Sequence, residues 1–182
     1  MTSLEDLFRC LTDQGSRPYD GDFEAVTQLA HALQSAMLAQ SAQAGPAMIA
    51  AALFHDIGHL VRPEAREELL AGTDDRHEGV GAAILEPILG PAVSEPVRLH
   101  VAAKRYLVTT RPGYADRLSD GSRMTLRLQG GAMSTAEAER FASHPYAQDA
   151  IALRYWDDAA KLVGQDTPPL DHFRAVLAPL AG

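Results

Sequence analysis

Residues 51–61, AALFHDIGHLV, place His55, Asp56 and His59 inside an otherwise apolar run. A buried imidazole or carboxylate costs free energy unless something pairs with it. The run continues a segment that begins at Pro46, a residue suited to the first turn of a helix. We therefore interpret residues 46–61 as a helix whose polar side chains have a partner inside the protein, and a metal ion is the first candidate.

The composition limits the classes of function. A chain of 182 residues with 46% hydrophobic residues fits one compact domain, and we expect residues 1–182 to form it. The formal net charge is -8 and no stretch is dense in Lys or Arg, which disfavours nucleic-acid binding. The first residues lack a signal-peptide pattern and no apolar run could span a membrane, so we expect a cytoplasmic protein. Cys10 is the sole cysteine, so metal ligands must be His, Asp, Glu or Tyr.

Helical periodicity dominates the chain and strand-like alternation is missing, so the predicted fold class is all-α. We expect one helical bundle, in which Ser94 caps the fourth helix and a polar segment connects residues 62 to 76. The expected helices cover residues 23–42, 46–61, 77–88, 94–108, 135–142, 147–163 and 170–180.

Six metal-ligand candidates fall on five separate helical segments among small or apolar neighbours, and His55 and Asp56 share one of these segments. Helical bundles build carboxylate–histidine sites from inward-pointing residues of this kind, and such ligands suit Fe, Mn, Co, Ni or Zn. An aspartate has two oxygens, so Asp56 could bridge two ions while the adjacent His55 binds one of them. Two ions therefore suit the donor set better than one. The candidates are His31, His55, Asp56, His77, His100 and Asp157.

Six segments together resemble the HD-domain superfamily of metal-dependent phosphohydrolases and related oxygenases. Within it, the chain resembles the small diiron oxygenases that cleave carbon–phosphorus bonds, such as the 2-amino-1-hydroxyethylphosphonate dioxygenases. The resemblance extends over about residues 19–161, and HVAAKRYL and RYWD are its more specific motifs. The segments are VTQLAHALQSA (26–36), AALFHDIGH (51–59), RHEGVGAAIL (76–85), LHVAAKRYLV (99–108), LSDGSRMTLRLQGGAM (118–133) and LRYWDDAAK (153–161).

The resemblance implies a mixed-valent pair of iron ions, Fe(II)/Fe(III), with O2 as co-substrate. It assigns His31, His55, Asp56 and Asp157 to one iron. Asp56 would bridge to the second iron, which His77 and His100 complete. The smaller number of protein ligands on the second iron would leave positions open for substrate and oxygen.

The family resemblance also implies residues near the substrate amine. Tyr19 matches a tyrosine that occupies an open metal position until substrate arrives. An acidic residue after it contacts the amine, but the segment YDGDFEAVTQLAH carries about two extra residues. Counting from Tyr19 selects Asp22, whereas counting back from His31 selects Glu24, which we favour. Phe23 beside an acid would also suit a quaternary ammonium through cation–π attraction.

Basic residues follow or precede the candidate ligands at helical spacing. Lys104 and Lys161 come four residues after His100 and Asp157, and Arg154 comes three residues before Asp157. The resemblance assigns phosphonate binding to Lys104, Arg154 and Ser122 and places His59 near the substrate as a hydrogen-bonding or proton-accepting group. Lys161 could equally be a surface lysine.

These features predict an oxygenase acting on a small organophosphonate. The expected substrate is 1-hydroxy-2-aminoethylphosphonate or its N-trimethylated analogue, giving phosphate plus glycine or glycine betaine. The alternative is a metal-dependent phosphohydrolase acting on a phosphate ester or nucleotide, because the same ligands and the same Lys104 and Arg154 would serve that reaction. The sequence leaves the oligomeric state open.

Overall fold

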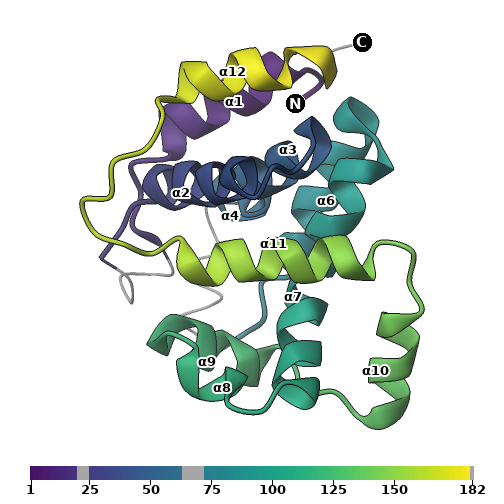
Figure 1. Cartoon of the computed structure of the whole chain (residues 1–182). Coiled ribbons are helices and arrows are strands. Elements are labelled where there is room, and N and C mark those ends of the chain that lie inside the picture. Colours follow the sequence, from purple (N-terminus) through teal and green to yellow (C-terminus); the bar gives the residue numbers. More distant parts are fainter. Residues whose placement is uncertain (20–24, 63–71, 181–182) are drawn as a thin grey trace.

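The computed structural model describes residues 1–19, 25–62 and 72–180 and is all-α, as the sequence predicts (Figure 1). Within these ranges, the strand-like pairing is a single isolated bridge between Pro18 and Thr27. No described helix is long and apolar enough to cross a membrane. The helices are α1 (Leu4–Gln14), α2 (Gln28–Ser41), α3 (Pro46–Phe54), α4 (Ile57–Val61), α6 (His77–Leu89), α7 (Pro91–Thr110), α8 (Tyr114–Arg117), α9 (Asp120–Leu128), α10 (Thr135–Ala142), α11 (Ala147–Ala159), α12 (Leu170–Leu177) and the 3-10 helix η2 (Ala178–Leu180).

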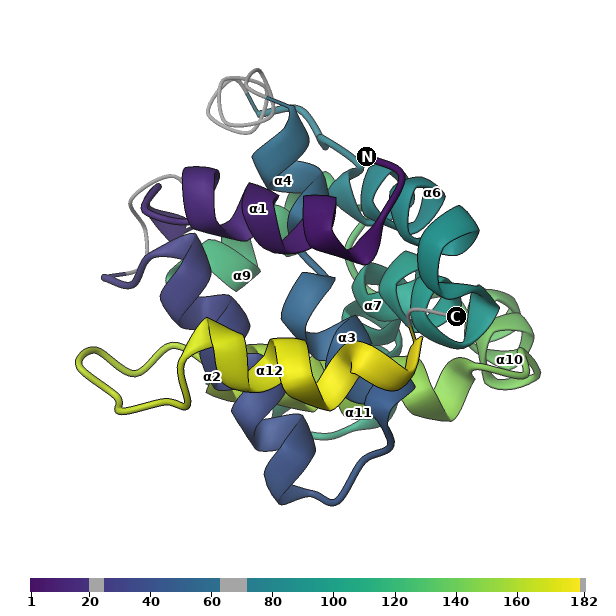
Figure 2. The same ribbon diagram turned by 90° about the horizontal axis from the view of Figure 1, so that it is seen from above.

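The main hydrophobic core surrounds α3, which packs against α2, α7 and α11. Residues 49–54 of α3 are all buried, so this helix is apolar on every side. Phe8 of α1 packs edge-to-face on Phe54 at 5.5 Å, and Phe173 of α12 is also fully buried. Helices α1 and α12 form the upper layer in Figure 1, with α8, α9 and α10 at the opposite end, and Figure 2 looks down on that layer.

The expected helix over residues 23–42 begins later than predicted. Residues 25–27 are not helical, and α2 begins at Gln28 because Thr27 has extended backbone angles and its side chain accepts a hydrogen bond from Ala30 N. The residues before Thr27 pair instead with the preceding chain, where Tyr19 N donates to Val26 O at 3.0 Å. The pairing fixes Tyr19 beside the start of α2.

The predicted Ser94 cap is wrong. Helix α7 begins three residues earlier, at Pro91, whose fixed backbone angle suits a first helical turn. Ser94 is therefore a fully buried residue inside the helix. The helix expected over 147–163 also ends early, at Ala159, whereas the one expected over 135–142 is confirmed as α10. Helices α1, α8 and α9 were not predicted.

The predicted helix over residues 46–61 is interrupted at its polar pair. Helix α3 ends at Phe54 and α4 begins at Ile57, so His55 and Asp56 occupy the turn between them. The backbone of Asp56 leaves helical geometry, with φ -100° and ψ 13°. The turn frees the two side chains from the 100° separation that a continuous helix would impose.

Helices α4 and α6 meet without space for a side chain at Gly58. A β-carbon on Gly58 would lie 2.1 Å from the carbonyl oxygen of His77 and 2.8 Å from its carbonyl carbon. Both are backbone atoms, so the contact cannot be relieved by a side-chain movement. The absence of a side chain at residue 58 thus sets how closely His77 approaches the turn that carries His55 and Asp56.

Gly58→Ala is therefore expected to lower the free energy of unfolding by about 1–3 kcal/mol, the usual cost of overpacking. Urea denaturation followed by circular dichroism would measure it. Gly79→Ala is the matched control, because a β-carbon there meets nothing within 4 Å, and it should be neutral or slightly stabilising. Equal stability of the two variants would contradict the tight α4–α6 contact.

Candidate metal centre and substrate cavity

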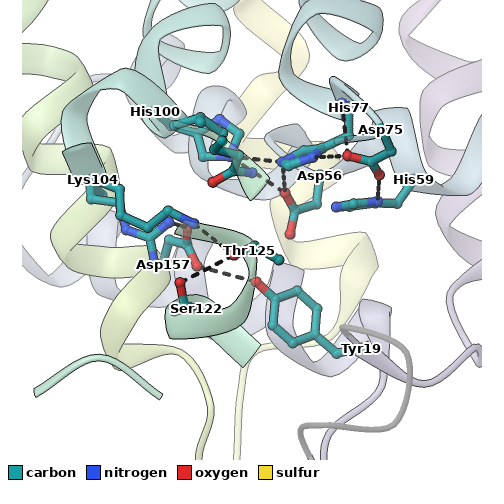
Figure 3. A pocket seen from close by; sticks show the side chains of 13 residues that line it. Tyr19, Asp56, His59, Asp75, His77, His100, Lys104, Ser122, Thr125 and Asp157 are labelled. Atoms are coloured by element: carbon teal, nitrogen blue, oxygen red, sulfur yellow. Dashed lines mark hydrogen bonds and ion pairs between the residues drawn. The ribbon is translucent and has the colours of Figure 1, made fainter. Parts of the chain in front are cut away.

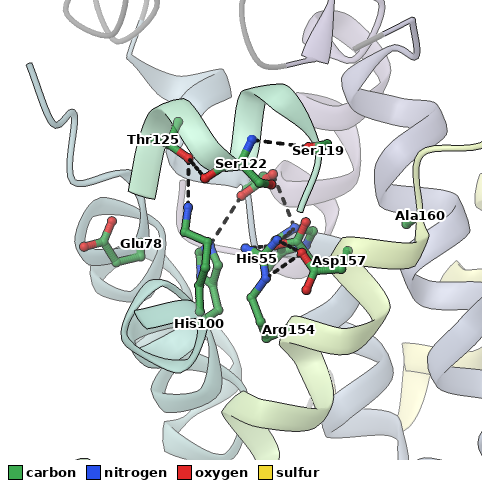
Figure 4. Close-up of polar contacts among 12 residues, drawn as sticks. His55, Glu78, His100, Ser119, Ser122, Thr125, Arg154, Asp157 and Ala160 are labelled. Carbon is green, nitrogen blue, oxygen red and sulfur yellow. Dashed lines mark hydrogen bonds and ion pairs between the residues drawn. The ribbon is translucent and has the colours of Figure 1, made fainter. Parts of the chain in front are cut away.

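The structure brings all six predicted ligand residues together in the interior. Figure 3 labels Asp56, His77, His100 and Asp157, and Figure 4 labels His55. Their donor atoms form two groups, and within each group the atoms lie within 4.8 Å of one another. The first group comes from α2, the α3–α4 turn and α11, and the second from that turn, α6 and α7. The groups are His31, His55 and Asp157, and Asp56, His77 and His100.

The four histidines are oriented in the same way. Each uses Nδ1 to donate a hydrogen bond to a protein oxygen, and three of the acceptors are backbone carbonyls. With its hydrogen on Nδ1, each neutral imidazole has a lone pair on Nε2. In this tautomer the ring can bind a metal ion through Nε2. The acceptors are Ala160 O for His31 (2.8 Å), Ala52 O for His55 (2.9 Å), Val97 O for His100 (2.7 Å) and Asp75 Oδ1 for His77 (2.9 Å).

The Nε2 atoms then face one another in pairs. Those of His31 and His55 lie 3.1 Å apart, as do those of His77 and His100. Two lone pairs cannot hydrogen-bond to each other, so each pair needs either a proton or a metal ion at its nitrogens, and two neutral imidazoles can bind a metal ion. The donor set therefore fits two metal ions.

Asp56 lies between the two histidine pairs. Its Oδ1 is 3.5 Å from His77 Nε2 and 3.8 Å from His100 Nε2, while its Oδ2 is 3.3 Å from His55 Nε2 and 3.7 Å from His31 Nε2. Asp56 Oδ2 is buried and has no hydrogen-bond partner, as a metal-directed oxygen would. One oxygen thus faces each pair, which is the arrangement a bridging carboxylate needs.

The surroundings favour the metal-binding form of Asp157 and of His100, whereas His77 has to release a proton when it binds a metal. Burial by itself raises the pKa of Asp157, but the Arg154 guanidinium holds it well below its usual range. Burial and the neighbouring His77 both lower the pKa of His100, which favours its neutral form. Burial opposes protonation of His77 as well, yet the Asp75 carboxylate raises its pKa to about 9.

A small cavity adjoins the second donor group, with a volume of about 20 Å³. The predicted substrate residues Tyr19, His59, Lys104, Ser122 and Arg154 all line it. Lys104 is 3% exposed, so its ammonium is held inside the protein. The cavity is therefore a polar chamber with buried cations, suited to a small anion.

The comparisons with known proteins agree with this geometry. The HD-domain sequence family matches residues 29–138. The chain is 45% identical to hydroxymethylphosphonate dioxygenase of Gimesia maris over 92% of this chain and 82% of that protein. It is 41% identical to the glycine-betaine-forming [1-hydroxy-2-(trimethylamino)ethyl]phosphonate dioxygenase of Leisingera caerulea, over 88% of this chain and 81% of that one. An uncharacterized protein of Acanthamoeba polyphaga mimivirus is 36% identical over 90% of this chain and 74% of its own length.

The chain belongs to the HD-domain family. The predicted kinship with phosphonate dioxygenases of this family is thereby confirmed. His55 and Asp56 form the HD pair of this HD domain, and the structure places them at a helix break rather than inside a helix.

Two of the predicted substrate residues, Arg154 and Lys104, are tied to other protein groups. Arg154 Nη1 lies 2.6 Å from Asp157 Oδ2, and the same guanidinium also pairs with Asp158. Lys104 Nζ donates to Thr125 Oγ1 at 2.8 Å. Both cations are thereby oriented toward the cavity wall before any ligand binds.

Tyr19 lies against the first donor group. Its ring stacks on the His31 imidazole at 4.0 Å, and its hydroxyl donates to Asp157 Oδ1 at 3.4 Å. The proposed occupation of an open metal position by Tyr19 remains a prediction. Asp22, Glu24 and Phe23 lie outside the described residues, and the helical register that favoured Glu24 does not apply, because α2 begins only at Gln28.

The sequence interpretation missed Asp75, which connects two histidines (Figure 3). Its Oδ1 accepts a hydrogen bond from His77 Nδ1 at 2.9 Å, and its Oδ2 lies 2.7 Å from His59 Nδ1. The two imidazole rings stack at 3.9 Å. Asp75 is 2% exposed, and the contacts with His59 and His77 hold its pKa well below the usual range although burial alone would raise it.

Asp75→Asn is expected to weaken metal binding by about 10- to 100-fold, the usual effect of losing a partner of a metal-binding histidine. Asparagine offers one acceptor and one donor, so its amide hydrogens would oppose one of the two Nδ1–H groups. Anaerobic titration with Fe(II) against a competing chelator would measure the affinity. Asp74→Asn serves as control, because that carboxylate accepts from the Arg76 backbone. Equal affinities in both variants would refute the role of Asp75.

Proposed function

We propose that this HD domain, formed by residues 1–182, is a diiron oxygenase that cleaves the carbon–phosphorus bond of a small 1-hydroxyphosphonate. The observation that carries the proposal is the pair of facing Nε2 lone pairs bridged by Asp56, beside a cavity with buried cations. One iron would be held by His31, His55, Asp56 and Asp157. The other would be held by Asp56, His77 and His100, with fewer protein donors and therefore room for substrate.

The names of two relatives support the substrate class. One protein is named for hydroxymethylphosphonate and the other for [1-hydroxy-2-(trimethylamino)ethyl]phosphonate. Both compounds carry a hydroxyl and a phosphonate on one carbon, so we extend that feature to the substrate of this chain. The other end of the molecule could be hydrogen, an aminomethyl group or a trimethylammoniomethyl group, and we assign its recognition to Glu24 or Asp22.

Lys104, Ser122 and Arg154 are proposed to bind the phosphonate. Their buried ammonium, hydroxyl and guanidinium line one cavity, and charge-assisted hydrogen bonds to phosphonate oxygens suit all three. Lys104 Nζ also donates to Thr125 Oγ1, a hydroxyl on the wall of the same cavity. Arg154 is held by Asp157 and Asp158, which fixes the plane of its remaining N–H groups.

His59 is proposed to take the proton of the substrate hydroxyl. Its Nδ1 lies 2.7 Å from Asp75 Oδ2, and a hydrogen on that nitrogen would leave the lone pair on Nε2. His59 lines the cavity and its side chain is 14% exposed, which gives a small ligand access to that atom. Asp75 would then keep His59 in the tautomer that accepts a proton.

Bound iron would supply the activation of O2. In the overall reaction the carbon that bears the hydroxyl is oxidised to a carboxylate, O2 is reduced and the carbon–phosphorus bond breaks to give phosphate. Hydroxymethylphosphonate would give formate, and the amino and trimethylammonio compounds would give glycine and glycine betaine. Tyr19 would leave its position on the cavity wall to admit the substrate. A cytoplasmic location remains a prediction.

Phosphate release from the iron-loaded protein is expected to require oxygen. The test uses hydroxymethylphosphonate, 1-hydroxy-2-aminoethylphosphonate and 1-hydroxy-2-(trimethylammonio)ethylphosphonate, each with and without O2. At least one of them should give phosphate and the matching carboxylate in equal amounts under air, because both products come from one bond cleavage. A phosphate monoester and a nucleotide are included as substrates of the hydrolytic alternative.

Release that continues unchanged without oxygen, from a phosphonate or from an ester, would identify a phosphohydrolase and overturn the proposal. The ratio of kcat/KM among the three phosphonates would identify the group at the other end of the substrate. A clear preference for hydroxymethylphosphonate would remove the need for an amine-binding acid at residue 22 or 24.

His77→Ala is expected to abolish phosphate release while reducing the iron content from two ions toward one per chain. The first donor group keeps His31, His55 and Asp157, whereas the second loses one of its two imidazoles. Iron analysis by mass spectrometry after gel filtration, alongside the phosphate assay, would measure both effects. His172→Ala is the control, because His172 is exposed and bonds to Gln40. Full activity with a single iron would contradict the two-iron assignment.

A further inference from the structure

Lys161 lies just beyond the end of α11 and is half-buried. Its Nζ donates to Ser122 Oγ at 3.0 Å and to Ser119 Oγ at 3.3 Å. The same ammonium lies 5.2 Å from the centroid of the Tyr19 ring, within the range of a cation–π contact. One side chain thus joins α11, the start of α9 and the segment before α2.

Two of the residues that Lys161 contacts line the substrate cavity. Tyr19 and Ser122 are among the described lining residues, whereas Lys161 is not, so the ammonium lies behind them. Ser119 is the N-cap of α9, and its Oγ also accepts from Ser122 N at 3.2 Å (Figure 4). Lys161 therefore holds the first turn of α9 at the point from which Ser122 enters the cavity.

The direction of the hydrogen bond matters for Ser122. A hydroxyl that accepts from an ammonium still has its own hydrogen to donate. With Lys161 behind it, Ser122 can present that hydrogen to an oxyanion in the cavity. A lone pair pointing the same way would repel a phosphonate instead.

The Tyr19 ring is held by two contacts of different kinds. The His31 imidazole stacks on it at 4.0 Å, and the Lys161 ammonium lies over it. If Tyr19 has to move for substrate to enter, the strength of the Lys161 contact influences how readily it does so.

We propose that Lys161 is a positioning residue that orients the Ser122 hydroxyl toward a bound phosphonate and holds the Tyr19 ring on the cavity wall. The inference deepens the proposed function and rests on it for the identity of the anion. It assigns Lys161 no contact with the reacting atoms.

Lys161→Met tests the proposal, because methionine keeps much of the length but loses the charge and the donors. The dissociation constant of hydroxymethylphosphonate is measured calorimetrically on the Fe(II)-loaded protein without oxygen, and KM and kcat are measured in air. We expect the dissociation constant and KM to rise about tenfold, as for loss of one charged hydrogen bond, and kcat to change less. Lys161→Arg retains charge and donors and should recover part of the affinity.

A double-mutant cycle with Ser122→Ala separates positioning from a general effect of charge. If Lys161 acts through Ser122, Lys161→Met should cost clearly less affinity in the Ser122→Ala background than in the wild type. Equal losses in the two backgrounds, or an unchanged dissociation constant in Lys161→Met, would overturn the proposal. Arg127→Met is the control. Arg127 is on α9, the helix that carries Ser122, and the substitution removes an exposed positive charge from it. Thermal denaturation checks folding, and Lys161→Gln replaces Lys161→Met if that variant does not fold.

The binding measurement also distinguishes failure of this inference from failure of the proposed function. If no phosphonate is turned over, but the anaerobic affinity follows the expected cycle, the oxygenase proposal falls and the role of Lys161 stands. If turnover is oxygen-dependent and Lys161→Met binds and reacts like the wild type, only the role of Lys161 falls.

Discussion

The constraint on which the rest of the structure depends is the orientation of four buried imidazoles. Each Nδ1 is bound to a fixed protein oxygen, so each Nε2 presents a lone pair, and these lone pairs meet in two pairs 3.1 Å apart. The arrangement is unfavourable without cations, because lone pairs repel and Asp56 Oδ2 lacks a partner. The helices that carry the histidines also form the main core around α3, so hydrophobic packing holds the donors in place.

Because of the break between α3 and α4, the adjacent residues His55 and Asp56 contribute to different donor groups. On a continuous helix, the side chains of residues 55 and 56 would diverge by about 100°. The turn lets His55 join the first donor group while Asp56 faces both. Gly58 then allows α6 to approach within backbone contact, which brings His77 within reach of the same carboxylate.

The all-α class could be predicted from the sequence because it follows from the helical periodicity of apolar residues. The six ligand candidates could be predicted because they are polar residues within these apolar segments. The sequence interpretation misplaced the starts of α2 and α7, where Thr27 and Pro91 determine the boundary and periodicity does not. It missed Asp75 because one acid in a polar connection looks like any solvent-exposed acid. The available signal was its position two residues before His77, close enough to reach that imidazole.

The cavity also requires a balance of buried charge. Asp56, Asp75 and Asp157 line it together with Lys104 and Arg154, and burial would disfavour the ionised carboxylates unless cations stayed nearby. Arg154 is committed to Asp157 and Asp158, so it stabilises the first donor group even when the cavity is empty. Lys104 lies on the same cavity wall and donates to the neutral hydroxyl of Thr125. Buried positive charge therefore balances the buried carboxylates of the cavity, although the formal net charge of the whole chain is -8.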